Sequence, residues 1–344
     1  MGVVIGWDVG GAHLKAARAE NGRVVDAIQV ASPLRLGLDR LAQSFTEAKA
    51  RIGTAHRHVV TMTGELADTF SSRIEGVESL STMAVRELAP DAVSLYAGRA
   101  GFIRPQDARE HVEDIASANW FASASLVARV RRVALFVDMG STTTDLVPIV
   151  DGAVAARGYT DAERLAAGEL VYTGLVRTFV MAVADRAPFA GHWMPLINEY
   201  FATMADVHRI LGSLPEGVDQ MATADGRAKT VEASRARLAR MVGCDAQGAD
   251  DEAWAALARW FAEAQIRAVV DGARLVLSSR TLTADAPIVA AGIGDAVVGE
   301  VAQRLGRKHI AFGTMLDVAP EARDRASHCA PATALALLAP HETA

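Results

Sequence analysis

The stretch VVIGWDVG at residues 3–10 decides the fold, because it recurs as VALFVDMG at residues 133–140. The match continues without a gap, from GAHLKAARAENG in the first copy into STTTDLVPIVDG in the second, at a constant offset of 130 residues. Asp8 therefore corresponds to Asp138. Since a duplicated segment marks structurally equivalent halves, the sequence predicts two related domains.

The duplicated segment has the pattern of a three-stranded meander. An apolar strand leads into a turn that begins Asp-x-Gly, a second strand follows, and Asn21-Gly22 or Asp151-Gly152 forms a type I′ hairpin into a third strand. A glycine after each aspartate lets backbone N–H groups approach a ligand closely. Two ordinary hairpins would account for the turns, but not for an acidic residue at the end of both first strands.

Apolar spacing predicts further helices and strands between and after the two copies. The predicted helical segments are 38–51, 66–72, 107–128, 163–183, 193–240, 253–278, 296–305 and 332–339, and the predicted strands are 59–63 and 286–291. The fold class is therefore α/β, with domain I at 1–131 and domain II at 132–344. A stretch at about 186–250 is interpreted as a helical cap inserted into domain II, and the C-terminal helix as packing back on domain I.

The composition excludes several classes of protein. Of 344 residues, 51% are hydrophobic and 22% charged, as in globular proteins rather than disordered or fibrous ones. A net charge of -6 gives no basic field for nucleic acid or an anionic membrane surface. No apolar stretch reaches the roughly 20 residues of a membrane span. The sequence predicts neither nucleic acid nor a membrane as a partner.

The cysteines and the N-terminus indicate a compartment. Cys244 and Cys329 are the only cysteines, which excludes a disulfide scaffold and a Cys-rich zinc cluster and is typical of a reducing compartment. The N-terminus lacks the basic segment and long apolar run of a secretory signal. We therefore expect a cytoplasmic protein. The oligomeric state stays open, with a homo-oligomer among the alternatives.

The loop DMGSTTTD at residues 138–145 concentrates two carboxylates, four hydroxyl groups and a glycine. Hydroxyl and backbone N–H donors suit phosphate oxygens, whereas carboxylates suit Mg²⁺. Asp8 and Asp138 are expected to face each other across a cleft, which two carboxylates tolerate only with a cation or a proton between them. Ser and Thr that merely favour β structure are the alternative interpretation. The glycine and hydroxyl residues that offer such donors in the two loops are Gly10, Gly11, Gly140, Ser141, Thr142 and Thr143.

Other candidates lie near these loops. Lys15 follows His13 by two residues, so both side chains share one face of the predicted strand and either is a candidate to bind phosphate; His13 is equally typical of a structural histidine. Arg177, in GELVYTGLVRT, has the chemistry to clamp a phosphate or carboxylate, although a solvated helix face also fits it. The turn Gly292-Ile293-Gly294 resembles a third phosphate loop, a signal that many ligand-free turns share.

The paired loops IGWDVGGAHLKAA and LFVDMGSTTTDLVPI, with the late AAGIGD, resemble the phosphate and adenosine motifs of the actin-like ATPase superfamily over nearly the whole chain. This resemblance implies a duplicated, ribonuclease H-like two-domain fold around a central cleft. The motifs DMGSTTTD and GELVYTGLVRT resemble its hydantoinase/oxoprolinase-related branch. SANW at 117–120 and PLINEYFATMADVHR at 195–209 resemble the group linked to tetrahydromethanopterin-dependent one-carbon transfer, which is similar to methanofuran-biosynthesis synthases.

That resemblance implies a transferase. Its reaction would join an aminomethylfuran-methyl diphosphate to the phenol of γ-glutamyltyramine, forming an aryl ether and releasing diphosphate. The two small molecules would be its partners, Asp8 and Asp138 would hold Mg²⁺, and the glycine and hydroxyl loops would line the diphosphate. Lys15 and Arg177 would neutralise the departing charge. Asp145 or Glu169 would accept the phenol proton.

Three alternatives remain at the level of the sequence. An ATP-dependent kinase or ATPase would use the same loops, although Ala12 stands where many superfamily kinases carry a hydroxyl residue. A hydantoinase/oxoprolinase-like hydrolase would normally need a longer chain or a partner subunit. A non-catalytic, nucleotide-gated clamp would present the cap to another protein. Whether ATP binds stays open.

Overall fold

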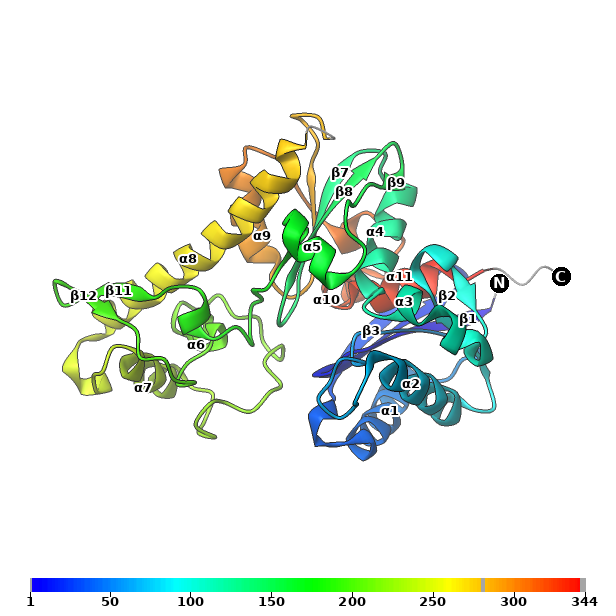
Figure 1. The fold of residues 1–344 in the computed structure, drawn as a ribbon, viewed down its shortest axis with the longest axis horizontal. Coiled ribbons are helices and arrows are strands. Elements are labelled where there is room, and N and C mark those ends of the chain that lie inside the picture. The colour runs from blue at the N-terminus through cyan, green and yellow to red at the C-terminus, as the bar shows by residue number, and fades with distance from the viewer. Residues whose placement is uncertain (1, 280–281, 341–344) are drawn as a thin grey trace.

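The computed structural model describes residues 2–279 and 282–340, and contains two mixed β-sheets with helices around them (Figure 1). The first sheet has the order β3-β2-β1-β4-β5-β6, and the second β10-β8-β7-β13-β14 with β9 also on β8. We call residues 2–131 the first half and the described residues from 132 onward the second half. The strands of the first sheet are β1 (Val3–Val9), β2 (His13–Glu20), β3 (Arg23–Ala31), β4 (Arg57–Met62), β5 (Ala92–Tyr96) and β6 (Phe102–Ile103). Those of the second are β7 (Ala134–Met139), β8 (Thr144–Val150), β9 (Ala153–Val154), β10 (Leu170–Val171), β13 (Ile288–Ala291) and β14 (His309–Ala311).

The two sheets share one plan, as the sequence repeat predicts. In each sheet, the first strands in the chain pair antiparallel as a meander. Later strands then add in parallel beside the first strand of the meander, β4 beside β1 and β13 beside β7. The type I′ turns are confirmed, because Asn21 and Gly22 have φ of 51° and 83°, and Asp151 and Gly152 have 52° and 79°. The registers agree too, since Asp8 pairs with Lys15 and Asp138 with Asp145. The predicted α/β duplication is confirmed.

Helices cover the outer faces of both sheets. Those on the first sheet are α1 (Leu38–Ile52), α2 (Arg73–Leu88) and the short α3 (Val112–Ile115), and those on the second are α5 (Asp161–Ala167), the long α8 (Asp251–Ser278) and α9 (Asp295–Arg304). The stripe that α1 buries, which includes Leu41, Phe45 and Ile52, packs in one core with Trp7 of β1. None of the helices in the described part of the chain is both long and apolar enough to cross a bilayer.

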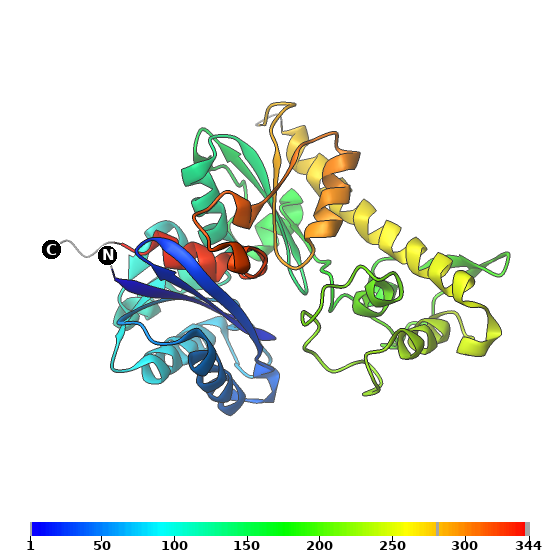
Figure 2. The ribbon, with the colours of Figure 1, turned by 180° about the vertical axis from the view of Figure 1, so that it is seen from behind.

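Two helices join the halves. Both views show α11 (Ala330–Leu338, red) lying between the blue first sheet and the second half, beside α4 (Asn119–Val130) (Figure 2). One apolar core includes Val4 of the first sheet, Phe136 of the second and Leu335 of α11. The approach is so close that a Cβ on Gly6 would collide with the carbonyl of Ala332. The short α10 (Arg323–His328) leads into α11.

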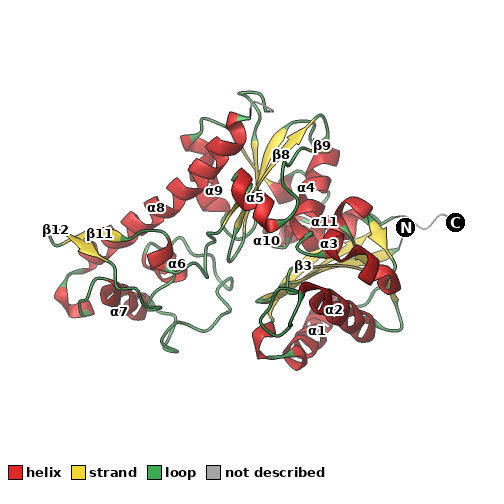
Figure 3. Ribbon diagram, in the orientation of Figure 1, coloured by secondary structure: helices red, strands yellow, loops and turns green. Residues whose placement is uncertain are grey.

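An insertion extends from the second half, between β10 and the end of α8. It contains the hairpin β11 (Arg186–Phe189) and β12 (His192–Pro195), then α6 (Met204–Ile210) and α7 (Val231–Met241), and has a core of its own against the start of α8. Long loops connect these elements (Figure 3). The predicted, mostly helical cap at about 186–250 is therefore wrong in part, because a hairpin and loops make up much of it.

Other predicted helices also differ from the structure. Residues 66–72 form turns, and α2 begins only after Ser72, whose Oγ accepts a hydrogen bond from the Glu75 N–H. The predicted helix 163–183 ends early at Gly168, which has a left-handed φ of 72°. The region 107–128 is broken before α4 at Ser117, whose φ is 53°. The helices predicted at 38–51, 253–278, 296–305 and 332–339 are confirmed as α1, α8, α9 and α11, and the strands at 59–63 and 286–291 as β4 and β13.

Candidate active site

Two adjoining pockets lie in the cleft between the halves. The larger, with a volume of about 520 Å³, is called the loop pocket because both Asp-x-Gly loops line it. The second, of about 470 Å³, is called the insertion pocket because α6 and the loop after it form much of its wall. Among the sequence-predicted residues, the loop pocket collects Asp8, Gly10, Gly11, His13, Lys15, Asp138, Gly140, Ser141, Thr142, Thr143, Asp145 and Arg177.

The two loops have the same backbone conformation at their tips. The Gly10 N–H donates to the His13 carbonyl at 3.0 Å, and the Gly140 N–H donates to the Thr143 carbonyl at 2.9 Å. The loops follow β1 and β7 directly, so each strand carries its aspartate to the pocket. The duplicated sequence thus places two similar turns on opposite sides of one cavity.

Two buried carboxylates, Asp8 and Asp138, and the partly exposed Asp145 lie around one lysine in the loop pocket. Lys15 Nζ lies 3.9 Å from Asp8 Oδ2. Asp145 Oδ1 accepts a 2.6 Å hydrogen bond from Arg164 Nη2, and the Arg164 guanidinium also lies 4.0 Å from the centre of the Trp120 ring. Asp138 forms no ion pair with another described residue. Asp8 and Asp145 therefore each have a cation as partner, whereas Asp138 has none within the described part of the chain.

Burial controls the protonation of this cluster. It raises the pKa of Asp138 to about 7, against the effect of Lys15, and Asp145 and Asp8 raise that pKa further. Burial also raises the pKa of Asp8, although Lys15 and the Asn119 side chain lower it. Burial lowers the pKa of Lys15, but the carboxylates, Asp8 first, outweigh it and the net pKa is raised. Lys15 therefore stays a cation, while Asp138 is partly protonated at neutral pH.

Several buried polar atoms lining this pocket lack a partner among the described residues. They are Asp8 Oδ1, His13 Nε2 and Ser141 Oγ. Burial, followed by Lys15 and Arg177, lowers the pKa of His13 to about 3, so its imidazole is neutral and offers one N–H donor. Unpaired buried polar atoms are costly in a folded protein, and a polar ligand is one reason for their persistence.

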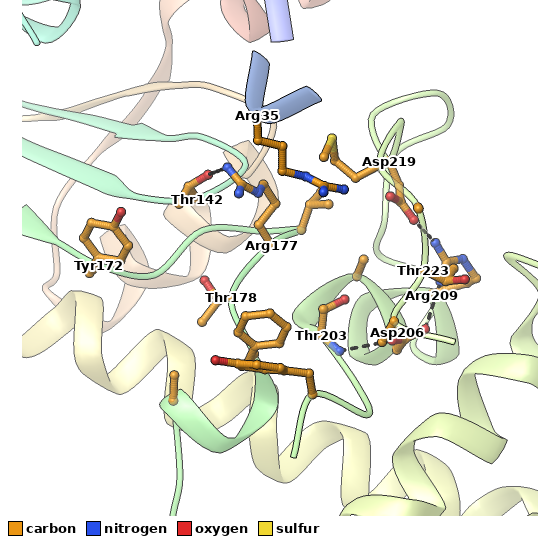
Figure 4. A pocket seen from close by; sticks show the side chains of 18 residues that line it. Arg35, Thr142, Tyr172, Arg177, Thr178, Thr203, Asp206, Arg209, Asp219 and Thr223 are labelled. Atoms are coloured by element: carbon orange, nitrogen blue, oxygen red, sulfur yellow. Dashed lines mark hydrogen bonds and ion pairs between the residues drawn. The ribbon is translucent and has the colours of Figure 1, made fainter. Parts of the chain in front are cut away.

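The second loop is held against the segment that carries Arg177. The N–H groups of Val176 and Arg177 donate to the Ser141 carbonyl at 3.2 and 2.8 Å. A Cβ on Gly174 would collide with the backbone of Ser141 and Thr142. Arg177 Nη1 also lies 3.3 Å from Thr142 Oγ1 (Figure 4). The close backbone contact explains why residues 174–178 form a turn against the loop rather than a helix.

Three predicted residues lie outside both pockets, which corrects their expected roles. Glu169 is 1% exposed, and its two carboxylate oxygens accept from the N–H groups of Arg157 and Gly158 at 2.7 and 2.9 Å, so it is not placed to receive a phenol proton. Gly292 and Gly294 form the turn between β13 and α9, and they pack against Met139 and Asp138. They allow this close packing and line neither pocket.

Sequence reasoning missed four residues that line or support the loop pocket. Arg164 forms an ion pair with Asp145, and its guanidinium lies over the Trp120 ring. The Asn119 side chain hydrogen-bonds to Asp8 and lowers the pKa of that carboxyl group. Asn119 and Trp120 belong to the SANW stretch, which stood out in the sequence only through its resemblance to a known group of proteins. Arg35 lines both pockets from the first half and forms no ion pair with another described residue. No sequence signal marks Arg35, because only the tertiary fold brings it near Arg177.

A model of the hydantoinase/oxoprolinase family matches residues 57–336. The chain belongs to this family. One relative is (4-{4-[2-(gamma-L-glutamylamino)ethyl]phenoxymethyl}furan-2-yl)methanamine synthase from Methanocaldococcus jannaschii. The chain is 32% identical to it over 251 residues, which cover 73% of this chain and 74% of that protein. It is 37% identical over 111 residues to the protein of the same name from Methanococcus vannielii, covering 32% of this chain and 50% of that one.

The fold of this hydantoinase/oxoprolinase family member also occurs in solved structures. A nucleotide-free acetone carboxylase structure superposes with a TM-score of 0.56 at 11% sequence identity, covering 97% of this chain and 70% of that chain. At this identity the likeness concerns the fold alone. Together with the two equivalent sheets, it agrees with the duplicated, actin-like architecture expected from the paired loops.

Proposed function

We propose that this chain is a transferase of methanofuran biosynthesis, which joins an aminomethylfuran-methyl diphosphate to the phenol of γ-glutamyltyramine. The relatives' shared name describes the ether product of that condensation, and the matched region includes most of this chain. The structural observation that carries the proposal is the loop pocket, where two phosphate-type turns, Lys15 and Arg177 surround unpartnered polar atoms. Tetrahydromethanopterin-linked one-carbon metabolism is the proposed setting.

The reaction breaks the bond between the exocyclic methylene carbon and the diphosphate oxygen. The electron pair of that bond leaves with diphosphate, and the phenol oxygen forms the new carbon–oxygen bond. Because an aminomethylfuran stabilises positive charge at this methylene, the main task of the protein is to stabilise the departing anion. Lys15, Arg177 and the loop N–H groups are suited to it, and Arg35 adds a third cation from the first half.

The phenol must lose its proton as its oxygen attacks. Asp145 is the proposed acceptor, because its side chain lines the loop pocket, whereas Glu169 does not. Burial raises the pKa of Asp145, and the ion pair with Arg164 opposes that rise. The Arg164–Trp120 contact fixes the orientation of the guanidinium and hence of the carboxylate.

Mg²⁺ is the proposed cofactor. Its usual sites combine one or two carboxylates with water and substrate phosphate oxygens, and Asp8 with an unpartnered oxygen beside Asp138 fits that description. Within residues 2–279 and 282–340, no group of three or more His, Cys, Asp or Glu side chains is arranged to hold a metal. When bound, Mg²⁺ would supply charge neutralisation to the diphosphate. The free thiols of Cys244 and Cys329 agree with a proposed location in the cytoplasm.

The test is ether formation by the purified protein. Both substrates are supplied with Mg²⁺, with and without ATP, and the ether and diphosphate are followed by mass spectrometry and a diphosphate assay. We expect equal amounts of both products without ATP. Phosphate release from ATP with no ether in either reaction would overturn the proposal in favour of an ATPase or kinase.

A further inference from the structure

The insertion pocket opens directly into the loop pocket. Arg35, Thr142, Tyr172, Arg177 and Met221 line both cavities. Its volume of about 470 Å³ falls in the usual range for small-molecule sites. A molecule held in the insertion pocket would therefore have one end at the loops and the other end among the elements of the insertion.

The middle of the insertion pocket is aromatic and apolar. The rings of Phe179 and Tyr200 lie 4.4 Å apart at an angle of 40°, and both line the cavity together with Val176 and Ala205. Tyr200 is 63% exposed, so much of its ring is free to contact a ligand. Aromatic pairs of this kind favour a further ring in a tilted or offset position.

The far wall of the insertion pocket carries both signs of charge. Figure 4 shows Arg209, Asp219 and Asp206 gathered away from Thr142 and Tyr172, with Thr203 and Thr178 between. Arg209 forms ion pairs with Asp219 and with Asp206. Asp206 is largely occupied, since Ser234 Oγ and the buried Arg237 guanidinium donate to it. Asp219 pairs with a second cation, Lys229, whose Nζ lies 3.5 Å away. Because a carboxylate can accept about four hydrogen bonds, Asp219 still has accepting positions open.

Resting on the proposed function, we propose that the insertion pocket is the subsite for the phenolic acceptor. The amino-acid end of γ-glutamyltyramine carries a carboxylate and an ammonium group, which match Arg209 and Asp219 respectively. Its ring lies against Phe179 and Tyr200. The phenol is thereby directed toward Thr142, Tyr172 and the loop pocket, where the diphosphate donor lies.

The alternative assignment, with the donor in the insertion pocket, fits less well. A diphosphate would bring high negative charge against Asp219 and Asp206, and it would leave the two Asp-x-Gly turns without a ligand. The loop pocket, in contrast, offers backbone turns and Lys15 at the position where a diphosphate needs them. Each cavity thus suits one of the two substrates.

The test compares two acceptors that differ only in the amino-acid end: γ-glutamyltyramine and tyramine. We expect the wild-type protein to prefer γ-glutamyltyramine in kcat/KM, and Asp219→Asn to reduce that preference roughly tenfold to hundredfold, mainly through the KM for γ-glutamyltyramine. Asp225→Asn is the matched control, because Asp225 also pairs with arginines of the insertion but lines neither pocket. Its preference should equal that of the wild type.

A second variant tests the ring contact. Phe179→Ala should raise the KM for both acceptors by a similar factor and leave the KM for the diphosphate donor within about twofold, since the donor lies in the other pocket. Two results would overturn the subsite. One is an equal loss of the preference for γ-glutamyltyramine in Asp219→Asn and Asp225→Asn, and the other is a Phe179→Ala variant in which the KM for the donor rises instead of the KM for the acceptors.

Calorimetric titration of γ-glutamyltyramine into the free protein separates the two proposals. Binding that weakens in Asp219→Asn but not in Asp225→Asn supports the subsite even if no ether forms, in which case only the proposed reaction fails. Ether formation by the wild type with no effect of Asp219→Asn or Phe179→Ala on acceptor binding would leave the reaction standing and refute the subsite.

Discussion

Lys15 and Asp145 occupy equivalent positions in the two halves, yet they carry opposite charges. Each pairs in register with the aspartate of its own first strand, Asp8 or Asp138. The duplicated backbone therefore places Lys15 and three carboxylates around a single cavity, where Lys15 pairs with Asp8 and Arg164 with Asp145. Asp138 is left without an ion-pair partner among the described residues, and a bound cation or proton relieves the cost of burying its charge.

The first prediction concerns Asp138 and pH. Burial raises its pKa to about 7 from an ordinary value of 3.8, so the folded state binds the proton more tightly than the unfolded state. This contribution to stability is complete below pH 3.8 and is lost as the pH rises through 7, with a total on the order of 4 kcal/mol. Thermal melts without ligand should show a falling Tm between pH 5 and pH 7.5.

Asp138→Asn should flatten this pH dependence and melt higher than the wild type at pH 7.5, while losing at least about 100-fold in ether formation. Asp151→Asn, a substitution at an exposed hairpin turn, serves as the control and should keep the wild-type slope. An Asp138→Asn protein with the same slope as the wild type would show that another group causes the pH dependence.

The second prediction separates two carboxylates with different roles. Asp145→Asn should reduce kcat by roughly 10² to 10⁴, because it removes the proposed proton acceptor. It should also lower the Tm, because the buried Arg164 guanidinium loses its charged partner. Glu169→Gln should retain most of the kcat, but its free energy of unfolding should fall by about 1 to 3 kcal/mol. The amide has one oxygen to accept a hydrogen bond, so one of the two backbone N–H groups loses its acceptor. Steady-state kinetics and thermal melts on both variants distinguish these patterns. The reverse result would make Glu169 the base.

At the scale of elements, a glycine in β1 determines how closely the halves pack. The backbone of α11 lies where the side chain of any other residue at position 6 would be. We predict that Gly6→Ala lowers the free energy of unfolding by about 1 to 3 kcal/mol, through overpacking against Ala332. Gly2→Ala is the control, because a Cβ there meets nothing within 4 Å. Denaturant titration measures both, and equal stabilities would show that α11 shifts at no cost.

The elements also show which parts of the fold the sequence predicts. Local sequence pattern predicts the meanders, their turns and the helices α1, α8, α9 and α11. In each of these segments, the spacing of apolar residues agrees with the burial, and the turn glycines have the φ angles that the turns require. Residues 174–178 have no such agreement. Their apolar spacing favours a helix, but Gly174 and the Ser141 carbonyl hold them in a turn against the second loop. The hairpin β11–β12 is equally hidden, since its stabilising contacts come from the distant α8.

The candidate site was predictable to the extent that the repeat contains it. Asp8, Lys15, Asp138 and Asp145 lie on strands and turns that the repeat identifies, and the structure brings them into one pocket. Arg35 and Arg164 were not predictable, because each comes from a segment with no motif and reaches the pocket only through tertiary packing. Gly292 and Gly294 resembled a ligand loop, yet glycine there serves contact with Met139.

At the scale of the whole molecule, the loop pocket belongs to both halves. Arg35 reaches it from the first half and Arg177 from the second, and α4 and α11 join the two sheets behind it. A ligand bound between these guanidinium groups contacts both halves at once. Ligand that binds only the folded protein stabilises it, by about 2.7 kcal/mol when its concentration is 100 times its Kd.

The last prediction follows from that geometry. Mg²⁺ with inorganic diphosphate should raise the Tm of the wild type by several degrees. This increase should fall by at least about half in Arg35→Ala, because the anion then loses one of its two cations on the first half, Lys15 being the other. Arg40→Ala is the matched control, since Arg40 is an exposed residue of α1 whose guanidinium donates only to Gln43. Both variants should have a wild-type Tm without ligand, as neither side chain is buried. If Arg35→Ala and Arg40→Ala respond to diphosphate alike, Arg35 does not contact the anion and belongs to the acceptor side of the cleft.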